Sequence, residues 1–488
     1  MLGLILLIAG AFISPINHYI SAFVLLIGSV VLYFLFAVTL DSKNYLSLKA
    51  VFTLVWLFTI GLADLKLVDY QEQWQRNTWF LLALAYAMFQ IGILLGSRLG
   101  GKIADRLTKK RGLQRGRLKL ELRPERLFGI CVVVSAVGLI CFVANVCIRG
   151  WIPYFVKETG MYAQFYTKFY LFAVAASMIS GLCYYCLKTQ PLAKWKKFVL
   201  ILCIFYSTFI FPILVVSRGT FICSALSLTA VIFYLNKRKF WVLLTCVVVM
   251  FGVYEVGSAA RNYTSDELNA LFQPSEIVIS PGTDNPLGPD DNPNIENPGK
   301  LTFQLPVGPD DNPNIENPGK LTFQLPGKVA FLYSYLTIGH DNFNEAVQNA
   351  TEYTYGVRQL KPFNVLLRSS KIDNIIDNGE RCLVRPYLTT INLIGNSYYD
   401  LRWFGVGFFM LVWAIGFGMI ESCYLKGKGI FSLLVLGNTL TPVVLCFFES
   451  WMSEFSVWMH WGLILILCLI ACVTLLPKKK SNTKNKSV

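Results

Sequence analysis

Stretches of apolar residues long enough to cross a lipid bilayer recur along this chain of 488 residues. A helix needs about 20 apolar residues to span the hydrocarbon layer, and about twelve stretches approach that length. They lie near residues 2–15, 19–40, 50–67, 78–97, 127–148, 168–187, 198–216, 220–235, 240–258, 401–420, 430–448 and 457–476. Since 55% of the residues are hydrophobic and only 15% are charged, a bilayer is the expected solvent. We therefore expect an all-α polytopic membrane protein.

The first apolar stretch, Met1 to Ile16, is short for a span. It is not followed by the small-residue cleavage site of a signal peptide, and further apolar stretches come soon after it. We expect it to form a first helix that tilts little or thins the bilayer locally.

Lysine and arginine gather in alternate connections between the apolar stretches. If the N-terminus is cytoplasmic, the inside connections are 41–49, 98–126, 188–197, 236–239 and 425–429, together with the tail from 478. These segments hold 27 of the 44 lysines and arginines, which satisfies the positive-inside rule. The net charge of +15 therefore orients helices, and it does not indicate a nucleic-acid partner.

The same alternation divides the chain into four parts. Nine helices are expected in residues 1–258, one large extracytoplasmic loop in 259–400, three more helices in 401–477, and a basic tail in 478–488. Both termini are then cytoplasmic.

The large loop contains a tandem repeat within residues 287–326. The sequence GPDDNPNIENPGKLTFQLP occupies 288–306 and returns at 308–326. Two copies are too few for a solenoid core, so we interpret the repeat as an insertion. In residues 328–399, aromatic, small and charged residues are mixed, and this pattern predicts interfacial or re-entrant helices rather than spans.

Arg218 is out of place in this pattern. It lies in a very short connection between the apolar stretches 198–216 and 220–235, which the alternation places on the outer face. An arginine there opposes the orientation bias that the other connections obey. Two interpretations are open, a side chain that reaches lipid headgroups and an anion-binding site at the outer membrane boundary.

One motif points to a different class of membrane protein. GGKIADRLTKKRG, at residues 100–112, resembles the signature loop of major-facilitator transporters. In that family the loop joins the second and third helices, whereas here it follows the fourth expected helix, and no long central cytoplasmic linker divides the chain. We favour the interpretation that it is a positively charged inside loop.

Three segments taken together resemble the oligosaccharide repeat-unit polymerases, the O-antigen polymerase (Wzy-like) family. They are VVSRGTFICSALSLTAVIFYLNKRK, the region from SYLTIGHDNFNEAVQ to YGVRQLKPFNVLL in the large loop, and TTINLIGNSYYDLRWFGVGFFM. The last is similar to the family's T…Y-D-x-G-x-x-G entry into a late helix, although Leu-Arg-Trp-Phe follows the aspartate here. The tandem repeat has no counterpart in these motifs.

The resemblance implies a multi-pass enzyme of the bacterial cytoplasmic membrane. Such an enzyme transfers a glycan from a polyprenyl diphosphate to a second lipid-linked repeat unit on the outer face, as in O-antigen, capsule or exopolysaccharide synthesis. A chain-length regulator and a flippase are its implied partners, together with membrane lipids. Since the sequence has no DxD motif in a soluble-domain setting and no glycine-rich phosphate loop, we expect a metal-independent membrane glycosyltransferase without a cofactor.

Fixed cations at the membrane boundary would stabilise the charge that develops on the leaving diphosphate. Arg218 and Arg261 are the expected diphosphate-binding residues, because arginine makes paired hydrogen bonds to phosphate and stays charged. Arg358, Arg385 and Arg402 are further candidates for contact with the glycan or its phosphate, although solvated loop charges or local ion pairs also account for them.

A general base for the acceptor hydroxyl must lie on the outer face, near these arginines. The candidates are His340, Asp341, Glu345 and Asp400. A loop histidine is often structural, however, and Asp400 could pair with Arg402 or cap the following helix.

Two alternatives to the polymerase stay open. A glycan ligase would use the same donor and the same cations. A transporter or flippase would need charged residues or broken helices at mid-membrane depth, where the expected helices carry few charges.

Overall fold

The computed structural model describes most of the chain outside the tandem repeat. The described residues are 2–41, 43–68, 70–113, 124–155, 165, 167–236, 240–246, 327–367, 370, 372, 374–375, 381–385, 388–427 and 429–473. Within them, all regular secondary structure is helical. The tandem repeat and Arg261 lie outside the described residues.

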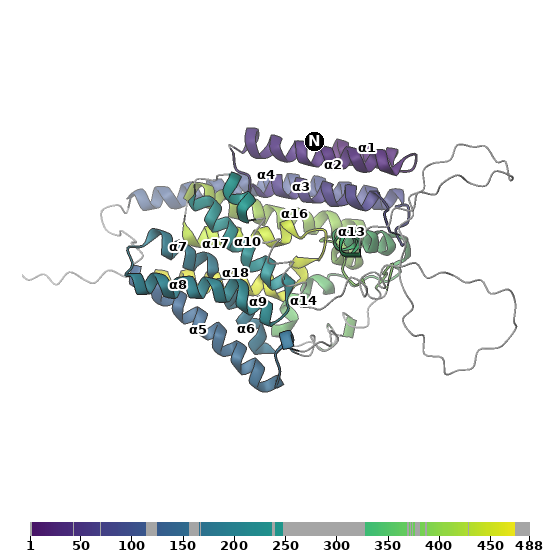
Figure 1. The fold of residues 1–488 in the computed structure, drawn as a ribbon. Coiled ribbons are helices and arrows are strands. Elements are labelled where there is room, and N and C mark those ends of the chain that lie inside the picture. The colour runs from purple at the N-terminus through teal and green to yellow at the C-terminus, as the bar shows by residue number, and fades with distance from the viewer. Residues whose placement is uncertain are drawn as a thin grey trace, which may run out of the picture.

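The N-terminal helices pack side by side along one edge of the molecule (Figure 1). They are α1 (Leu2–Ile13), α2 (His18–Phe34) with its π-helical extension η1 (Leu35–Leu40), α3 (Leu48–Asp64) and α4 (Arg76–Leu113). Their facing side chains belong to the large apolar core, in which Trp56, Trp79 and Phe89 are buried.

The middle of the chain covers the opposite side of the molecule. It comprises α5 (Pro124–Arg149), η2 (Pro153–Phe155), α6 (Lys168–Ser177), α7 (Ser180–Thr189), α8 (Lys194–Phe205), η4 (Tyr206–Ile210), α9 (Phe211–Leu214) and α10 (Arg218–Leu235). A short turn at Met178 and Ile179 separates α6 from α7.

The C-terminal part places helices between these two groups. It comprises α13 (Gly327–Asn349), α14 (Val357–Leu367), α16 (Gly395–Gly427), α17 (Ile430–Val444), η5 (Trp451–Ser453) and α18 (Phe455–Val473). In Figure 1, α13 lies across one end of the bundle, next to α3 and α16. We call this the α13 end of the molecule.

Six helical stretches of the described residues are long and apolar enough to cross a membrane. They are His18–Leu40, Arg76–Arg106, Arg126–Arg149, Lys168–Thr189, Lys194–Leu214 and Gly395–Gly427. The other expected stretches form shorter helices, except 240–258, of which only 240–246 are described. This is the architecture of a multi-pass helical membrane protein. Within the described residues six of the twelve expected stretches are long spans, because α1, α3, α10, α17 and α18 are shorter and most of 240–258 is not described.

The connections between helices gather at the two ends of the bundle. At the α13 end, the amide of Gln71 donates to Asp341 over 2.7 Å and the hydroxyl of Ser450 donates to the Leu393 carbonyl over 3.0 Å. At the opposite end, the hydroxyl of Tyr234 donates to Asn44 over 3.1 Å. Asn44, from an expected inside connection, and Gln71 and Ser450, from expected outside connections, thus lie at opposite ends.

The sequence around Gly100 is explained by close packing between α4 and α16. A Cβ at Gly92 would lie 2.7 Å from the carbonyl oxygen of Leu411, and one at Gly100 would lie 2.6 Å from that of Met419. Gly96, between them, meets the backbone of Ile415 even more closely. Glycines spaced by four residues let two membrane helices approach to backbone contact. Gly100, the first residue of the transporter-like motif, thus lies at the interface between α4 and α16.

Candidate functional site

Two cavities adjoin at the α13 end and share the side chains of Glu449 and Glu454. The first, of about 170 Å³, we call the cationic cavity. It is lined by Arg358, Lys361, Arg381, Leu383, Thr389, Thr390, Ile391, Asn396, Tyr399, Glu449 and Glu454. The second, of about 300 Å³, we call the aromatic cavity. It is lined by Tyr170, Leu171, Val174, Met178, Ser217, Gly219, Thr220, Cys223, Glu449, Trp451, Glu454, Ser456 and His460.

Two of the three cations of the first cavity, Arg358 and Lys361, are on α14, and the carboxylate of Asp400 lies at the N-terminus of this helix. The backbone N–H groups of Arg358 and Gln359 each donate to Asp400 over 3.0 Å, and the hydroxyl of Thr354 donates to it over 2.6 Å. A carboxylate at this position satisfies the free N–H groups of the first helical turn and opposes the helix dipole. Asp400 therefore caps α14, which is distant in sequence, rather than the helix that follows it.

Arg358 and Lys361 line the cationic cavity from successive turns of α14. The guanidinium of Arg358 lies 4.1 Å from the centre of the Tyr399 ring, a cation–π contact. Burial lowers the pKa of Arg358, although arginine stays charged at neutral pH. The ammonium of Lys361 lies 2.6 Å from Glu454. Arg381 reaches the same cavity from the segment that precedes α16.

Glu449 lies in the wall between the two cavities. Burial, together with the nearby carboxylate of Glu454, raises the pKa of Glu449 to about 7, and Lys361 and Arg381 oppose this shift. A carboxylate with a pKa near working pH exists in both protonation states, as a general base or acid requires. Such a shift is frequent at functional sites, where burial and a like charge act together.

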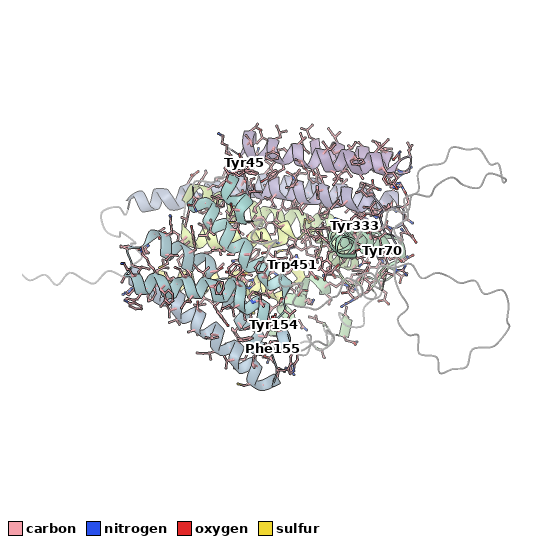
Figure 2. All side chains as sticks on the ribbon, viewed as in Figure 1. Tyr45, Tyr70, Tyr154, Phe155, Tyr333 and Trp451 are labelled. Carbon is pink, nitrogen blue, oxygen red and sulfur yellow. The ribbon has the colours of Figure 1, made fainter. Side chains whose placement is uncertain are left out.

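The aromatic cavity opens on the N-terminus of α10. The chain turns sharply before this helix, with Val216 in the left-handed region at a φ of 50°. Ser217 then caps α10 by accepting from the N–H of Thr220 over 3.2 Å. Trp451, labelled in Figure 2, packs against Gly219, and its buried indole N–H has no hydrogen-bond partner among the described residues.

Arg218 is the first residue of α10, and its side chain lies outside the described ones. A cation at a helix N-terminus is opposed by the helix dipole. The position of Arg218 is thus unfavourable in two respects: it opposes the positive-inside rule in the expected topology, and it opposes the dipole of α10. Ser217 and Gly219, on either side of it, line the aromatic cavity.

His340 and Asp341 lie apart from both cavities, in a buried network that joins α13 to α3. His340 contacts Thr59 over 2.9 Å through Nε2 and Asn392 over 3.1 Å through Nδ1. Burial, with a smaller contribution from Lys66, lowers the pKa of His340 to about 3. The imidazole is therefore neutral, and both of its nitrogens are engaged.

Asp341 is the centre of the same network. The ammonium of Lys66 lies 3.5 Å from its carboxylate, and it accepts hydrogen bonds from Gln71 over 2.7 Å and from the indole N–H of Trp74 over 3.0 Å. Burial raises the pKa of Asp341 and lowers that of Lys66, and their mutual attraction opposes both shifts. Tyr333, which donates to Gln71, and Tyr70 lie at this end in Figure 2.

The remaining candidates also do not line the two cavities. Glu345 accepts a hydrogen bond from the amide of Asn349 over 2.6 Å. Arg402, in the left-handed region at a φ of 52°, donates to the carbonyl of Ala350 over 2.6 Å and stacks on Tyr353. Arg385 lies four residues beyond Arg381, outside the cationic cavity. Of the candidates whose side chains are described, only Arg358 lines one of the two cavities, the cationic cavity. Asp400 does not line a cavity, but it caps the helix that carries Arg358.

Sequence reasoning missed Glu449, Glu454, Lys361 and Arg381. The two glutamates lie in FESWMSEF, between two apolar stretches, where an acidic pair on the expected outer face was an available signal. Lys361 and Arg381 resemble ordinary loop charges in the sequence, because only the tertiary structure brings α14 and the segment before α16 to one cavity.

Comparison of the chain with protein-family models, with curated proteins and with solved structures finds no match.

Proposed function

We propose that this protein is a glycosyltransferase that transfers a glycan from a polyprenyl diphosphate to the hydroxyl of a second lipid-linked oligosaccharide. The observation that carries the proposal is the meeting of two cavities at Glu449, one lined by cations and the other by aromatic and hydroxyl side chains. A transfer between two bound substrates needs two such compartments, with a proton acceptor where they meet.

In this proposal the α13 end faces the outside of a bacterial cytoplasmic membrane. The support is the distribution of lysine and arginine along the sequence, because 27 of the 44 fall in the expected inside connections, and Asn44 in one of these lies at the opposite end. The cavities then lie at the depth where a lipid diphosphate meets the outer surface. About twelve spans remain the expected topology.

The cationic cavity would hold the diphosphate of the donor. Arg358, Lys361 and Arg381 supply three positive charges against the two carboxylates of the shared wall. As the bond between the sugar and the diphosphate breaks, negative charge grows on the leaving diphosphate, and fixed cations stabilise that charge more than the ground state. Arg218 and Arg261 would add to this field from the membrane boundary.

The aromatic cavity would hold the acceptor sugar. Tyr170 and Trp451 offer aromatic faces, and the unpartnered indole N–H of Trp451 offers a hydrogen bond to a sugar oxygen. The acceptor oxygen attacks the anomeric carbon of the donor and forms the new glycosidic bond. The bond from that carbon to the diphosphate oxygen breaks, the diphosphate leaves with the electron pair, and the hydroxyl proton passes to Glu449.

The test is reconstitution of the purified protein in liposomes with lipid-linked oligosaccharide, followed by separation of the products by length. We expect a ladder of longer glycans from the wild-type protein and a strongly reduced one from Glu449→Gln at the same reaction time, with Glu345→Gln as the control that keeps the ladder. A single transfer to a non-lipid acceptor would indicate the ligase alternative. Unchanged glycan length with altered sidedness would contradict the proposal and indicate a transporter.

A further inference from the structure

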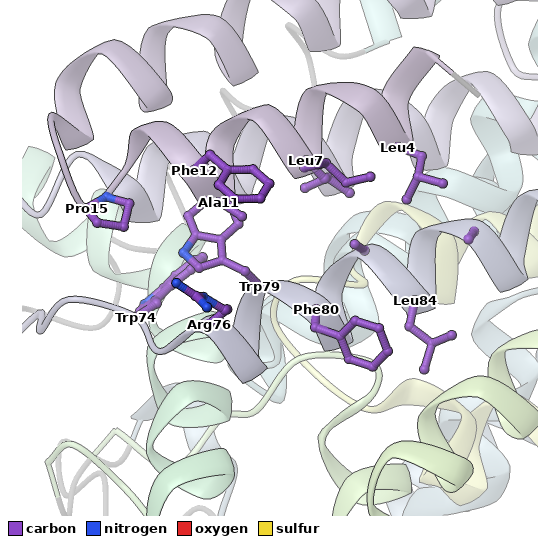
Figure 3. Close-up of a pocket in the computed structure, with 13 residues that line it drawn as sticks. Leu4, Leu7, Ala11, Phe12, Pro15, Trp74, Arg76, Trp79, Phe80 and Leu84 are labelled. Carbon is purple, nitrogen blue, oxygen red and sulfur yellow. The ribbon is translucent and has the colours of Figure 1, made fainter.

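A groove of about 520 Å³ lies between α1 and α4, away from the cavities described above (Figure 3). Its walls are apolar, formed by Leu4, Leu7, Ile8, Ala11, Phe12, Pro15, Trp74, Trp79, Phe80, Ala83, Leu84 and Ala87, and its lining includes one charged side chain, Arg76. This volume is within the roughly 300–1,000 Å³ range of small-molecule sites. The groove shares no lining residue with the cationic or the aromatic cavity.

Two polar groups lie at the α13 end of this groove, and neither has a partner among the described residues. Arg76, the first residue of α4, is exposed and forms no ion pair with the described residues. Trp79 is 2% exposed, and its indole N–H has no hydrogen-bond partner in the described part of the chain. The neighbouring Trp74 differs, because its N–H donates to Asp341.

The geometry points to an anionic phospholipid as the occupant of this groove. We propose that one acyl chain lies along the apolar walls and that the headgroup phosphate contacts Arg76 and the indole N–H of Trp79. An arginine near a membrane surface attracts anionic headgroups, and tryptophan is enriched at the membrane boundary, where its ring is apolar and its N–H is polar. Both cation and indole thus occupy the end of the groove where a headgroup would lie.

A bound lipid would have a structural consequence for α1. This helix is only 12 residues long and reaches the rest of the protein mainly through α2 and α4. Phe12 is 71% exposed and Ile8 is 46% exposed, although both line the groove. An acyl chain between α1 and α4 would cover these side chains and hold α1 on the bundle.

The proposal is tested by native mass spectrometry of the full chain in detergent after addition of phosphatidylglycerol or phosphatidylcholine. We expect retained phosphatidylglycerol at a higher occupancy than phosphatidylcholine. Arg76→Gln should weaken the retention about fivefold, the effect of one cation near a charged surface. Lys168→Gln is the matched control, because Lys168 is also an exposed first residue of a helix at the α13 end but does not line the groove.

A second variant, Ala83→Phe, fills the groove without removing charge. It should reduce the retention of phosphatidylglycerol, with thermal unfolding in lipid-free detergent used to show that the variant is folded. Equal retention of both phospholipids, an equal loss in Lys168→Gln, or unchanged retention in folded Ala83→Phe would overturn the proposal. Displacement of the phospholipid by an equal concentration of polyprenyl phosphate would overturn it in favour of a substrate lipid, and displacement by inorganic phosphate would reduce it to an anion site.

Discussion

The carboxylate of Asp400 accepts the backbone N–H of Arg358 over 3.0 Å, although the two residues lie 42 positions apart in the chain. This contact joins the start of α16 to the start of α14 and so fixes the face of α14 that lines the cationic cavity. Asp400 therefore acts on the cavity through the position of α14, and it does not line the cavity itself.

Asp400→Ala should destabilise the protein by about 2 kcal/mol, because it removes a helix cap and also leaves the buried hydroxyl of Thr354 without its acceptor. Asp400→Asn should recover part of this loss, since an amide oxygen still caps. Thermal unfolding of the two variants in detergent measures the difference. Equal stability of Asp400→Ala and the wild type would show that the cap is not needed.

The rate of the proposed glycan transfer should rise with pH up to about 7 and then level off. Glu449 has a pKa of about 7, and only its ionised form accepts a proton, so the rate falls roughly tenfold for each pH unit below that value. The pH dependence of kcat/KM measures this. In Glu449→Gln the rate should fall by about 10²–10⁴-fold. The remaining rate should no longer decrease below pH 7. If that decrease persists in the variant, another group is responsible for the titration.

Arg381 and Arg385 form a matched pair of arginines in one segment, of which only Arg381 lines the cationic cavity. Arg381→Gln should lower kcat of the proposed transfer by about 10²-fold, the effect typical of removing one group that stabilises transition-state charge. Arg385→Gln should change it little. Single-turnover kinetics with lipid-linked oligosaccharide distinguish the two, and the reverse order of effects would move the diphosphate away from this cavity.

His340 should make the fold sensitive to acid. Its pKa is about 3 in the folded protein against 6.5 in the unfolded chain, so the unfolded state binds a proton first. Stability is then lost as the pH falls below about 6.5, by about 2 kcal/mol between pH 7 and pH 5. Comparison of thermal unfolding across this range with His340→Asn isolates the effect, since the variant should lack this contribution. Parallel pH profiles of the two proteins would contradict the buried position.

Gly96→Leu should destabilise the α4–α16 interface by about 3 kcal/mol, because its side chain would overlap the backbone of Ile415. Gly416, on α16, faces open space, with no heavy atom within 4 Å of its Cβ position. Gly416→Leu is therefore the control and should leave the thermal midpoint nearly unchanged. Similar effects of both substitutions would point to helix propensity rather than packing.

The sequence predicted the helical class and the positions of the apolar cores, but not all helix boundaries: α4 continues to Leu113 through part of the expected connection 98–126, and the stretch 168–187 forms two helices, α6 and α7. Apolar runs such as 78–97 and 127–148 appear as the cores of α4 and α5. It did not predict that α16 begins at Gly395, before its apolar run, with a break at Leu401 and Arg402. At that break Asp400 accepts from the first turn of α14 and Arg402 donates to the carbonyl of Ala350, contacts that periodicity does not encode.

The candidate site was predictable only in part. Arg358 was a candidate and lines the cationic cavity, whereas His340 and Asp341 fall in the buried network around Lys66. The local sequence around a histidine and an aspartate in a polar segment does not show whether their side chains face a cavity or an adjoining helix. The roles expected for Arg218 and Arg261 stay predictions.

The sequence by itself determined that this chain is an assembly of membrane helices, because hydropathy and charge act locally, residue by residue, on the choice between lipid and water. Only the tertiary structure decided which polar residues meet. Glu449, Lys361 and Arg381 come from three separate segments, and their shared cavity, like the pKa of Glu449, arises from burial and from charges that are distant in the chain.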